Sequence, residues 1–147
     1  METLERHIIS NVEDCRLIDL QVIPDENGKL AVAEKFSGLP FNPKRMFFLY
    51  DVPSGAIRGG HSHFEEQQFI IPVTGAFRVI LDDGVERKEF FLVRPDKGLY
   101  IPSGIWRELD SFTSGAVCVV LSSINFREED YVRDYSRFLE LTQSKRK

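Results

Sequence analysis

The hydrophobic residues of this chain fall in short runs that end at turn residues. β-Branched and aromatic residues fill the runs, and some repeat every second position, as Phe77, Val79 and Leu81 do. Segments rich in Gly, Pro, Asn and Asp separate them. Strands at this spacing, with no helix between them, predict an antiparallel β-sandwich or barrel. The runs span 15–23, 29–36, 45–52, 67–73, 76–83, 88–94, 98–102 and 116–123.

Two local patterns sharpen this prediction. The tripeptide DDG at 82–84 stands between two of the runs and is a strong hairpin signal. Within 127–142 the apolar residues recur at helical spacing, and the acidic residues 128–130 lie where the dipole of a first helical turn favours them. We therefore expect one amphipathic helix near the C-terminus, packed on the outside of a β core. No repeat or low-complexity segment divides the sequence, so residues 1–147 are expected to form a single domain.

Composition narrows the class of protein. The chain has 147 residues, 42% hydrophobic and 29% charged, as in ordinary globular proteins. The formal net charge of -4 offers no basic surface for nucleic acid, and no apolar run approaches the roughly 18 residues of a membrane span. The N-terminus is too charged for a secretory signal. Cys15 and Cys118 have no CxxC spacing, and we expect both to be buried free thiols of a cytoplasmic protein.

The stretch RGGHSH, at 58–63, carries the candidate chemistry. His61 and His63 lie two residues apart, and on a strand such residues point to the same face. The two preceding glycines allow a sharp turn into that strand and leave space beside it. Imidazoles placed in this way bind a metal, transfer protons near neutral pH, or are ordinary strand residues. The third histidine, His7, is expected to be structural.

The surroundings of this pair resemble the two motifs of the cupin superfamily. In metal-binding cupins H-x-H is followed, after three or four residues, by Glu, and a later P-x-G is followed, after two residues, by His. Here the Glu position holds Gln67 or Gln68, and the His position holds Arg107, which cannot be a metal ligand. Glu65 and Glu66 lie just short of the Glu position and are expected to be solvated charges. The pattern therefore favours an acid–base site with no metal or other cofactor.

From Lys44 to Phe138 the chain resembles the sugar 3,4-ketoisomerases, the WxcM-like or FdtA-type branch of the RmlC-like cupins. The matching stretches are KRMFFLYDV, RGGHSH, FRVILDDG, GLYIPSGIWREL and LSSINFREEDYVRDYSRFL. The resemblance implies an all-β fold, a cupin or RmlC-like jelly-roll antiparallel β-sandwich with a short C-terminal helix, and a homodimer with exchanged N-terminal strands. The implied activity moves the ketone of a dTDP-4-keto-6-deoxyhexose from C4 to C3, for deoxyamino-sugar and surface polysaccharide biosynthesis.

The chemistry of this reaction suits the histidine pair. The ketone shift removes a proton from C3, passes through an enediol and returns a proton to C4, so it needs a base and an acid near neutral pH. We predict that His61 and His63 are the catalytic proton-transfer pair. Arg58 is predicted to stabilise the enediolate or the diphosphate. We also predict that Gln68 and Arg107 bind the substrate.

Three further residues of the predicted substrate-binding set have two interpretations each. Tyr100 and Trp106 either line the pocket and stack on a thymine or sugar, or pack in the core or at its rim. Arg78 either points inward, where it would suit a diphosphate, or faces solvent.

Other functions stay open at the level of the sequence. An RmlC-like 3,5-epimerase would use a histidine base with a tyrosine acid on the same scaffold, and a non-catalytic sugar-nucleotide-binding module would keep the fold without the chemistry. The chain has Phe47 or Phe48 where some family members have tyrosine. It has Gln67 where some have glutamate and Arg107 where some have histidine, and these two residues weaken a third alternative, a metal-dependent dioxygenase.

Overall fold

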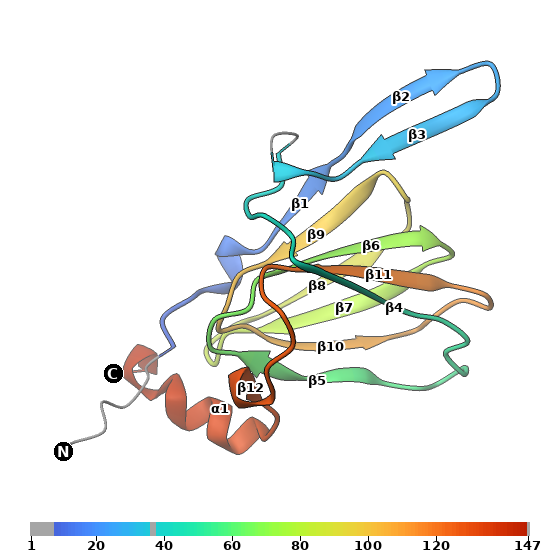
Figure 1. The fold of residues 1–147 in the computed structure, drawn as a ribbon. Coiled ribbons are helices and arrows are strands. Elements are labelled where there is room, and N and C mark those ends of the chain that lie inside the picture. The colour runs from blue at the N-terminus through green and yellow to red at the C-terminus, as the bar shows by residue number, and fades with distance from the viewer. Residues whose placement is uncertain (1–7, 36–37, 147) are drawn as a thin grey trace.

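Two five-stranded antiparallel sheets face each other in the computed structural model, which describes residues 8–35 and 38–146 (Figure 1). The first sheet has the strand order β1-β9-β6-β11-β4. Neighbouring strands in this order are far apart in sequence, as in a jelly roll. The strands are β1 (Arg16–Asp19), β4 (Arg45–Leu49), β6 (Gln68–Thr74), β9 (Lys97–Ile101) and β11 (Val117–Ser122).

The second sheet has the strand order β12-β5-β10-β7-β8. Its strands are β5 (Arg58–His63), β7 (Phe77–Asp82), β8 (Arg87–Leu92), β10 (Trp106–Asp110) and β12 (Tyr131–Val132). β7 and β8 form the hairpin that the DDG signal predicts, with Asp82 paired to Arg87 at its end. The predicted antiparallel β-sandwich is therefore confirmed, although sequence reasoning missed β10 as a strand.

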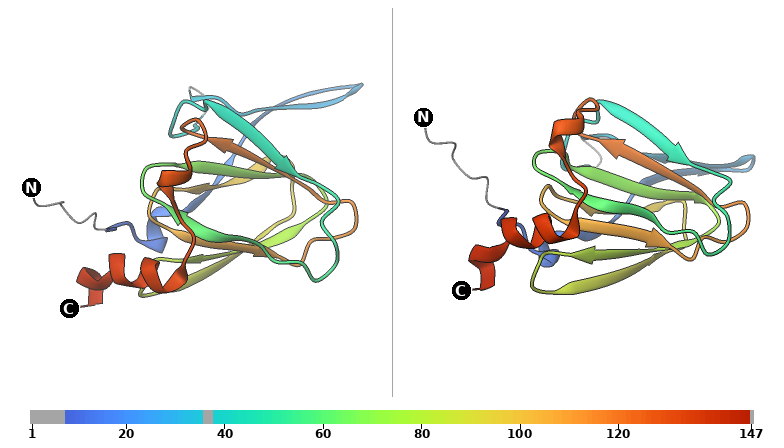
Figure 2. Two further views of the ribbon diagram at one scale, coloured as in Figure 1. Left: turned by 60° about the horizontal axis from the view of Figure 1, so that its bottom comes forward. Right: turned by 90° about the horizontal axis from the view of Figure 1, so that it is seen from below.

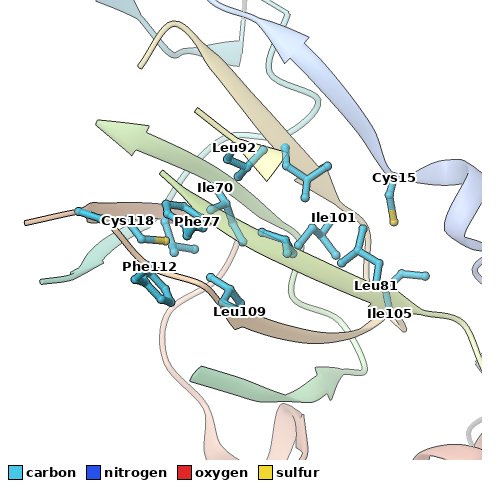
Figure 3. Packing of buried hydrophobic residues seen from close by; sticks show 14 of the residues in the cluster. Cys15, Ile70, Phe77, Leu81, Leu92, Ile101, Ile105, Leu109, Phe112 and Cys118 are labelled. Carbon is cyan, nitrogen blue, oxygen red and sulfur yellow. The ribbon is translucent and has the colours of Figure 1, made fainter. Parts of the chain in front are cut away.

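The inward residues of both sheets form the main hydrophobic core, shown in Figure 3. Phe77, Val79 and Leu81 are all buried, which confirms the period of two seen in the sequence. Cys15 and Cys118 are buried and free, as predicted. Burial raises the pKa of each thiol to about 12, so both stay protonated and act as small apolar residues.

The predicted C-terminal helix is confirmed only in its second half. Helix α1 spans Tyr135–Leu141, and the Asp134 side chain caps it by accepting hydrogen bonds from the backbone amides of Ser136 and Arg137. The preceding residues form a 3-10 turn, Glu128–Asp130, and then β12, which pairs with β5. The prediction is wrong for this first half because Asp134 supplies the helix cap and the acidic triplet does not. Figure 2 shows α1 at one end of the sandwich.

The N-terminal run 15–23 divides into two strands. β1 joins the first sheet, whereas β2 (Gln21–Asp25) pairs with β3 (Gly28–Val32) in a separate hairpin that projects away from the sandwich (Figures 1 and 2). Ile23 and Leu30 face each other across this hairpin and are both exposed. The hairpin therefore carries apolar side chains that the sandwich does not cover.

No helix within the described ranges is long and apolar enough to span a membrane. His7 lies outside the described residues, and its predicted structural role stays a prediction.

Candidate active site

Strand β5 brings the histidine pair to a cavity between the sheets, and glycine makes its path possible. Gly59 and Gly60 have φ angles of 82° and 72°, in the left-handed region that favours glycine. A Cβ on Gly59 would lie 2.9 Å from the carbonyl oxygen of Arg107. The register of β5 and β10 is irregular beside this contact, and Arg107 is the cross-strand partner of His61. The close approach of the two strands therefore places the guanidinium and the imidazole in one site.

The cavity has a volume of about 350 Å³ and opens to solvent. This volume suits a small-molecule ligand. None of the described residues that line it is acidic, so the cavity favours an anion. Its apolar wall contains Phe47, Leu49, Ile57, Ile70, Leu109 and Val120. Its polar side chains are Arg58, His61, Gln68, Arg107, Tyr131 and Arg133.

The two imidazoles lie side by side but have different surroundings. Their ring centroids are 4.8 Å apart and the rings meet edge to face. His61 lines the cavity, whereas His63 is 0% exposed and is not among the described residues of the lining. Tyr131, opposite His63 on β12, contacts both rings at centroid distances of 5.0 and 4.3 Å. A ligand in the cavity therefore meets His61 and Tyr131, with His63 behind them.

His63 lies between two buried carboxylates. Its Nδ1 is 3.3 Å from Oδ2 of Asp130, and its Nε2 is 3.6 Å from Oε2 of Glu66. Burial lowers the pKa of His63, although Asp130 raises it in part, so the imidazole is neutral at neutral pH.

The Asp130 carboxylate is held in its charged form. It accepts hydrogen bonds from the backbone amides of Glu65 (2.8 Å) and Glu66 (3.0 Å). Burial alone would raise the pKa of Asp130, but the interaction with His63 and these two amides outweighs burial and lowers the pKa. A fixed negative charge therefore stands behind the His63 ring.

A buried polar network connects Glu66 to the cavity. Glu66 accepts a hydrogen bond from the Arg45 guanidinium at 2.9 Å and another from the Gln68 side-chain amide. The oxygen of that amide accepts from Arg107 at 2.6 Å, and Arg107 also donates to the carbonyl oxygen of Ile105 at 2.9 Å. Glu66 thus balances the charge of Arg45 by direct contact, and it is linked to Arg107 through the Gln68 amide.

The expectation that Glu65 and Glu66 are solvated holds for only one of them. Glu65 is exposed and pairs with Arg127 at 2.8 Å. Glu66 is 0% exposed, and the prediction for it is wrong because Arg45 compensates its charge inside the protein.

The electrostatics of the cavity keep His61 neutral. Burial, and after it the positive charge of Arg107 and the neighbouring His63, lower the pKa of His61 to about 2. Burial also lowers the pKa of Arg107, to about 10, while Glu66 opposes this, so the guanidinium stays charged at neutral pH. Nε2 of His61 and Nε of Arg107 are buried without a hydrogen-bond partner in the described part of the chain. Both nitrogens therefore lack a partner in the described part of the chain, although neither has surface exposed to solvent.

The structure brings together three of the six predicted substrate-binding residues, since Arg58, Gln68 and Arg107 all line the cavity. Arg78 lies on the outer side of its sheet. Its guanidinium donates to both carboxylate oxygens of Asp110, at 2.7 and 2.5 Å, and to Glu89 at 3.3 Å. Its environment matches the solvent-facing interpretation.

Tyr100 and Trp106 pack in hydrophobic clusters outside the cavity. The Tyr100 hydroxyl donates to Oε1 of Gln67 at 2.6 Å. The Trp106 ring packs against Tyr135 and Phe138, with centroids 5.1 and 5.7 Å away. Within this chain both aromatic residues match the packing interpretation.

Sequence reasoning missed Asp130, Tyr131 and Arg133 as site residues. They belong to the stretch DYVRDY, which the resemblance to the ketoisomerases already included. The helical periodicity assigned this stretch to an outer helix, whereas β12 places Tyr131 opposite His63. The family resemblance was the signal that could have identified these residues.

The carboxylates beside His63 are poorly arranged for a metal. His63, Glu66 and Asp130 offer ligand atoms within 4.8 Å of one another. However, Asp130 and Glu66 face different nitrogens of one imidazole, and each already accepts two hydrogen bonds. A metal would have to displace these donors and bind both carboxylates together with a single ring nitrogen. The donor set fits a buried hydrogen-bonded cluster better than a metal site.

Comparisons with known proteins agree with this geometry. Residues 13–143 match the family described as FdtA: WxcM-like, C-terminal. A relative named TDP-4-oxo-6-deoxy-alpha-D-glucose-3,4-oxoisomerase, from Aneurinibacillus thermoaerophilus, is 36% identical over 84% of this chain and 88% of its own length.

Two solved structures have the same fold as this chain. A sugar 3,4-ketoisomerase from Thermoanaerobacterium thermosaccharolyticum, in complex with TDP, has a TM-score of 0.87 at 32% identity and covers 92% of this chain and 98% of its own. A 3,4-ketoisomerase from Helicobacter canadensis has a TM-score of 0.84 at 35% identity and covers 87% of this chain and 96% of its own. These relatives are 3,4-ketoisomerases, and the chain itself belongs to their family, the WxcM-like (FdtA) family of RmlC-like cupins.

Proposed function

We propose that this protein is an enzyme that converts a TDP-4-keto-6-deoxyhexose into its 3-keto isomer. The observation that carries the proposal is a neutral imidazole, His61, in a cavity lined by arginines, within a member of this family. A neutral imidazole accepts a proton, and arginine suits both a diphosphate and an enediolate. The relative from A. thermoaerophilus has this activity in its name. The 3-keto product is a substrate for amino transfer, as deoxyamino-sugar synthesis requires.

His61 is the proposed base. Its free Nε2 takes the proton from C3, the electron pair of that C–H bond forms a C3=C4 double bond, and the carbonyl electrons move to O4. Transfer of the O3 proton to O4 and return of a proton to C4 then give the 3-ketone. C3 is oxidised and C4 is reduced within one molecule, so the step balances without a redox cofactor.

Arginine side chains provide the positive charge that the reaction needs. Arg107 is 1% exposed and has a free Nε, so its charge acts on the developing enediolate in a poorly solvated site. Arg58 and Arg133 are exposed parts of the cavity lining. Arg133 already pairs with Glu128 at 2.7 Å, so Arg58 is the better candidate for the diphosphate. Arg107 therefore acts at the reacting atoms of the substrate, and the exposed part of the lining acts at its diphosphate.

The predicted proton-transfer pair becomes, in this proposal, a substrate-contacting base and a positioning residue. His63 has no exposed surface and contacts His61 edge to face. The Asp130 carboxylate holds the His63 ring from behind. His63 therefore acts through His61 and Tyr131, whose rings it supports.

The proposed activity is tested by incubating the protein with TDP-4-keto-6-deoxyglucose in D₂O and following the sugar protons by NMR. The expected result is a 3-keto product with deuterium at C4. Deuterium at C3 and C5 with epimerisation would identify a 3,5-epimerase instead. Tight binding without exchange at any carbon would indicate a non-catalytic binding module, and either result would overturn the proposal.

We also propose that catalysis needs no resident metal. Arg107, the cross-strand partner of His61, occupies the position where metal-binding cupins have a histidine ligand, and arginine cannot bind a metal. The Gln67 side chain, at the position of the glutamate ligand, accepts a hydrogen bond from the Tyr100 hydroxyl. Turnover should be unchanged after dialysis against a chelator. Stoichiometric zinc, iron or manganese in the purified protein, with turnover lost on chelation, would contradict this.

A homodimer with exchanged N-terminal strands is the proposed assembly, in the cytoplasm, where nucleotide-linked sugars are made. On the outer face of the first sheet Met46 and Phe48 are 59% and 51% exposed and continue the apolar cluster of Val119 and Leu121. A second copy would cover this face and the apolar β2–β3 hairpin. Light scattering at micromolar concentration should give twice the chain mass, and the double variant Met46→Lys/Phe48→Lys should give a monomer. A fully active wild-type monomer would refute the proposed assembly.

A further inference from the structure

Glu66 is a buried carboxylate that the proposed mechanism does not use. It is 0% exposed, and Arg45 compensates its charge at 2.9 Å. The Arg45 guanidinium also lies over the rings of Phe47 and Phe126, 5.1 and 5.6 Å from their centroids. Replacing a buried ion pair by apolar residues is often neutral or stabilising, so stability alone is a weak reason for this pair. The pair therefore raises the question of a second role beside the cavity.

Gln68 connects this pair to the cavity, which its side chain lines. Its amide nitrogen donates to Oε2 of Glu66, and its amide oxygen accepts from Nη1 of Arg107 at 2.6 Å. Gln68 lies on β6 between two paired strands, opposite Ser122 of β11 and Ile101 of β9, so its backbone is held on both sides. Rotation of the side-chain amide is the freedom that remains.

The two charged neighbours permit one orientation of this amide. A carboxylate only accepts hydrogen bonds, and a guanidinium only donates them. A turned amide would place its oxygen against Glu66 and its nitrogen against Arg107, and both hydrogen bonds would be lost. An amide nitrogen carries two hydrogens, and Glu66 takes one of them. The second is the hydrogen that Gln68 can offer to a ligand in the cavity.

We propose that Glu66 is a positioning residue that holds the Gln68 amide so that it presents an N–H to an oxygen of the ketosugar. The oxygens at C3 and C4 each change between ketone and hydroxyl in the reaction. An N–H donor serves such an oxygen in both forms, whereas the carbonyl oxygen of a turned amide would serve only the hydroxyl. The fixed amide therefore binds substrate and product at the same point, and it transfers no proton itself.

This inference rests on the proposed function, and a double-mutant cycle tests it. Gln68→Met removes the amide but keeps an unbranched side chain, and it should lower kcat/KM on the order of tenfold, the scale of one lost hydrogen bond. Glu66→Gln should lower kcat/KM less, by about fivefold, because Arg107 still favours the correct orientation of the amide. If Glu66 acts through Gln68, the double variant should lose no more than Gln68→Met alone. Glu65→Gln, which breaks only an exposed pair with Arg127, is the matched control and should stay within about twofold of wild type.

The cycle can contradict the inference in two ways. Additive losses in the double variant would show that Glu66 acts by another route, such as its contact with His63, and would overturn the inference. Unchanged kcat/KM in either single variant would overturn it as well.

The wild-type protein provides a second measurement if a variant misfolds. In a proton–nitrogen correlation spectrum the Gln68 amide gives a separate signal for each of its hydrogens. Addition of TDP-4-keto-6-deoxyglucose should shift the signal of the cavity hydrogen more than that of the hydrogen bonded to Glu66. Isomerisation without this larger shift overturns the inference, whereas a protein that neither binds nor converts the sugar overturns the proposed function instead.

Discussion

His61 and His63 are identical side chains, two residues apart on one strand, and the protein treats them in opposite ways. His61 faces a solvent-open cavity and the Arg107 guanidinium, with a free Nε2. His63 is sealed from solvent between Asp130 and Glu66. Burial, together with the positive charge of Arg107, keeps His61 neutral, whereas His63 lies between two carboxylates that flank its ring. In the proposed mechanism, the role of each imidazole follows from its surroundings and not from its spacing in sequence.

The largest expected effect is on turnover and comes from His61. His61→Asn should lower kcat by about 10²- to 10⁴-fold, because a general base is lost. The melting temperature should change little, since His61 has no counter-charge that would be left unpaired. Turnover and thermal melts of the same preparations provide the measurement, and near-normal kcat would contradict the assignment.

Compared with His61→Asn, His63→Asn should lower kcat less and the free energy of unfolding more. The substitution takes the imidazole from two buried carboxylates, and a buried polar group that loses its partner costs about 1–3 kcal/mol. Denaturant unfolding should therefore show a larger loss for this variant than for His61→Asn, with a smaller loss of kcat per folded molecule. The same kinetic loss in both variants, without destabilisation, would make the two histidines an equal catalytic pair.

Stability should fall as the pH falls below 6.5. An unfolded histidine has its ordinary pKa near 6.5, whereas the pKa of folded His61 is about 2, and that of folded His63 is also lowered. Below pH 6.5 the unfolded chain therefore binds more protons than the folded protein. The contribution of the two neutral histidines to the free energy of unfolding is complete above pH 6.5. It decreases by up to about 1.4 kcal/mol per histidine for each pH unit below 6.5.

Urea unfolding between pH 7.5 and pH 5 measures this dependence. His61→Asn should have a shallower slope than wild type over that range. A slope equal to that of wild type would mean that His61 titrates normally in the folded protein.

The smallest expected effect separates the two arginines predicted to bind the diphosphate. Arg58→Gln removes a charge from the cavity and should raise KM by about tenfold, the scale of one charge-assisted hydrogen bond. Arg78→Gln breaks only outer-surface pairs, with Asp110 and Glu89, and should leave KM within about twofold. A rise in KM for Arg78→Gln equal to that for Arg58→Gln would bring Arg78 back into the binding site.

The sequence by itself determined the local features of this protein. A period of two follows from strand geometry, so Phe77 and Val79 could be assigned to one buried face, and the histidines to a shared one. The DDG turn specified its own hairpin, and the motifs identified the family. These features depend on backbone geometry and neighbouring residues, which the sequence displays directly.

Only the tertiary structure decided which charges are buried. Glu66 is stabilised inside the protein by Arg45, 21 residues earlier, and Asp130 accepts from the amide of Glu66, 64 residues away. A second long-range contact, the pairing of β12 with β5, places Tyr131 opposite His63 in the cavity and not in the expected helix. A buried charge is tolerated only where a partner compensates for its lost hydration, and no local pattern specifies a partner that the fold brings from another strand.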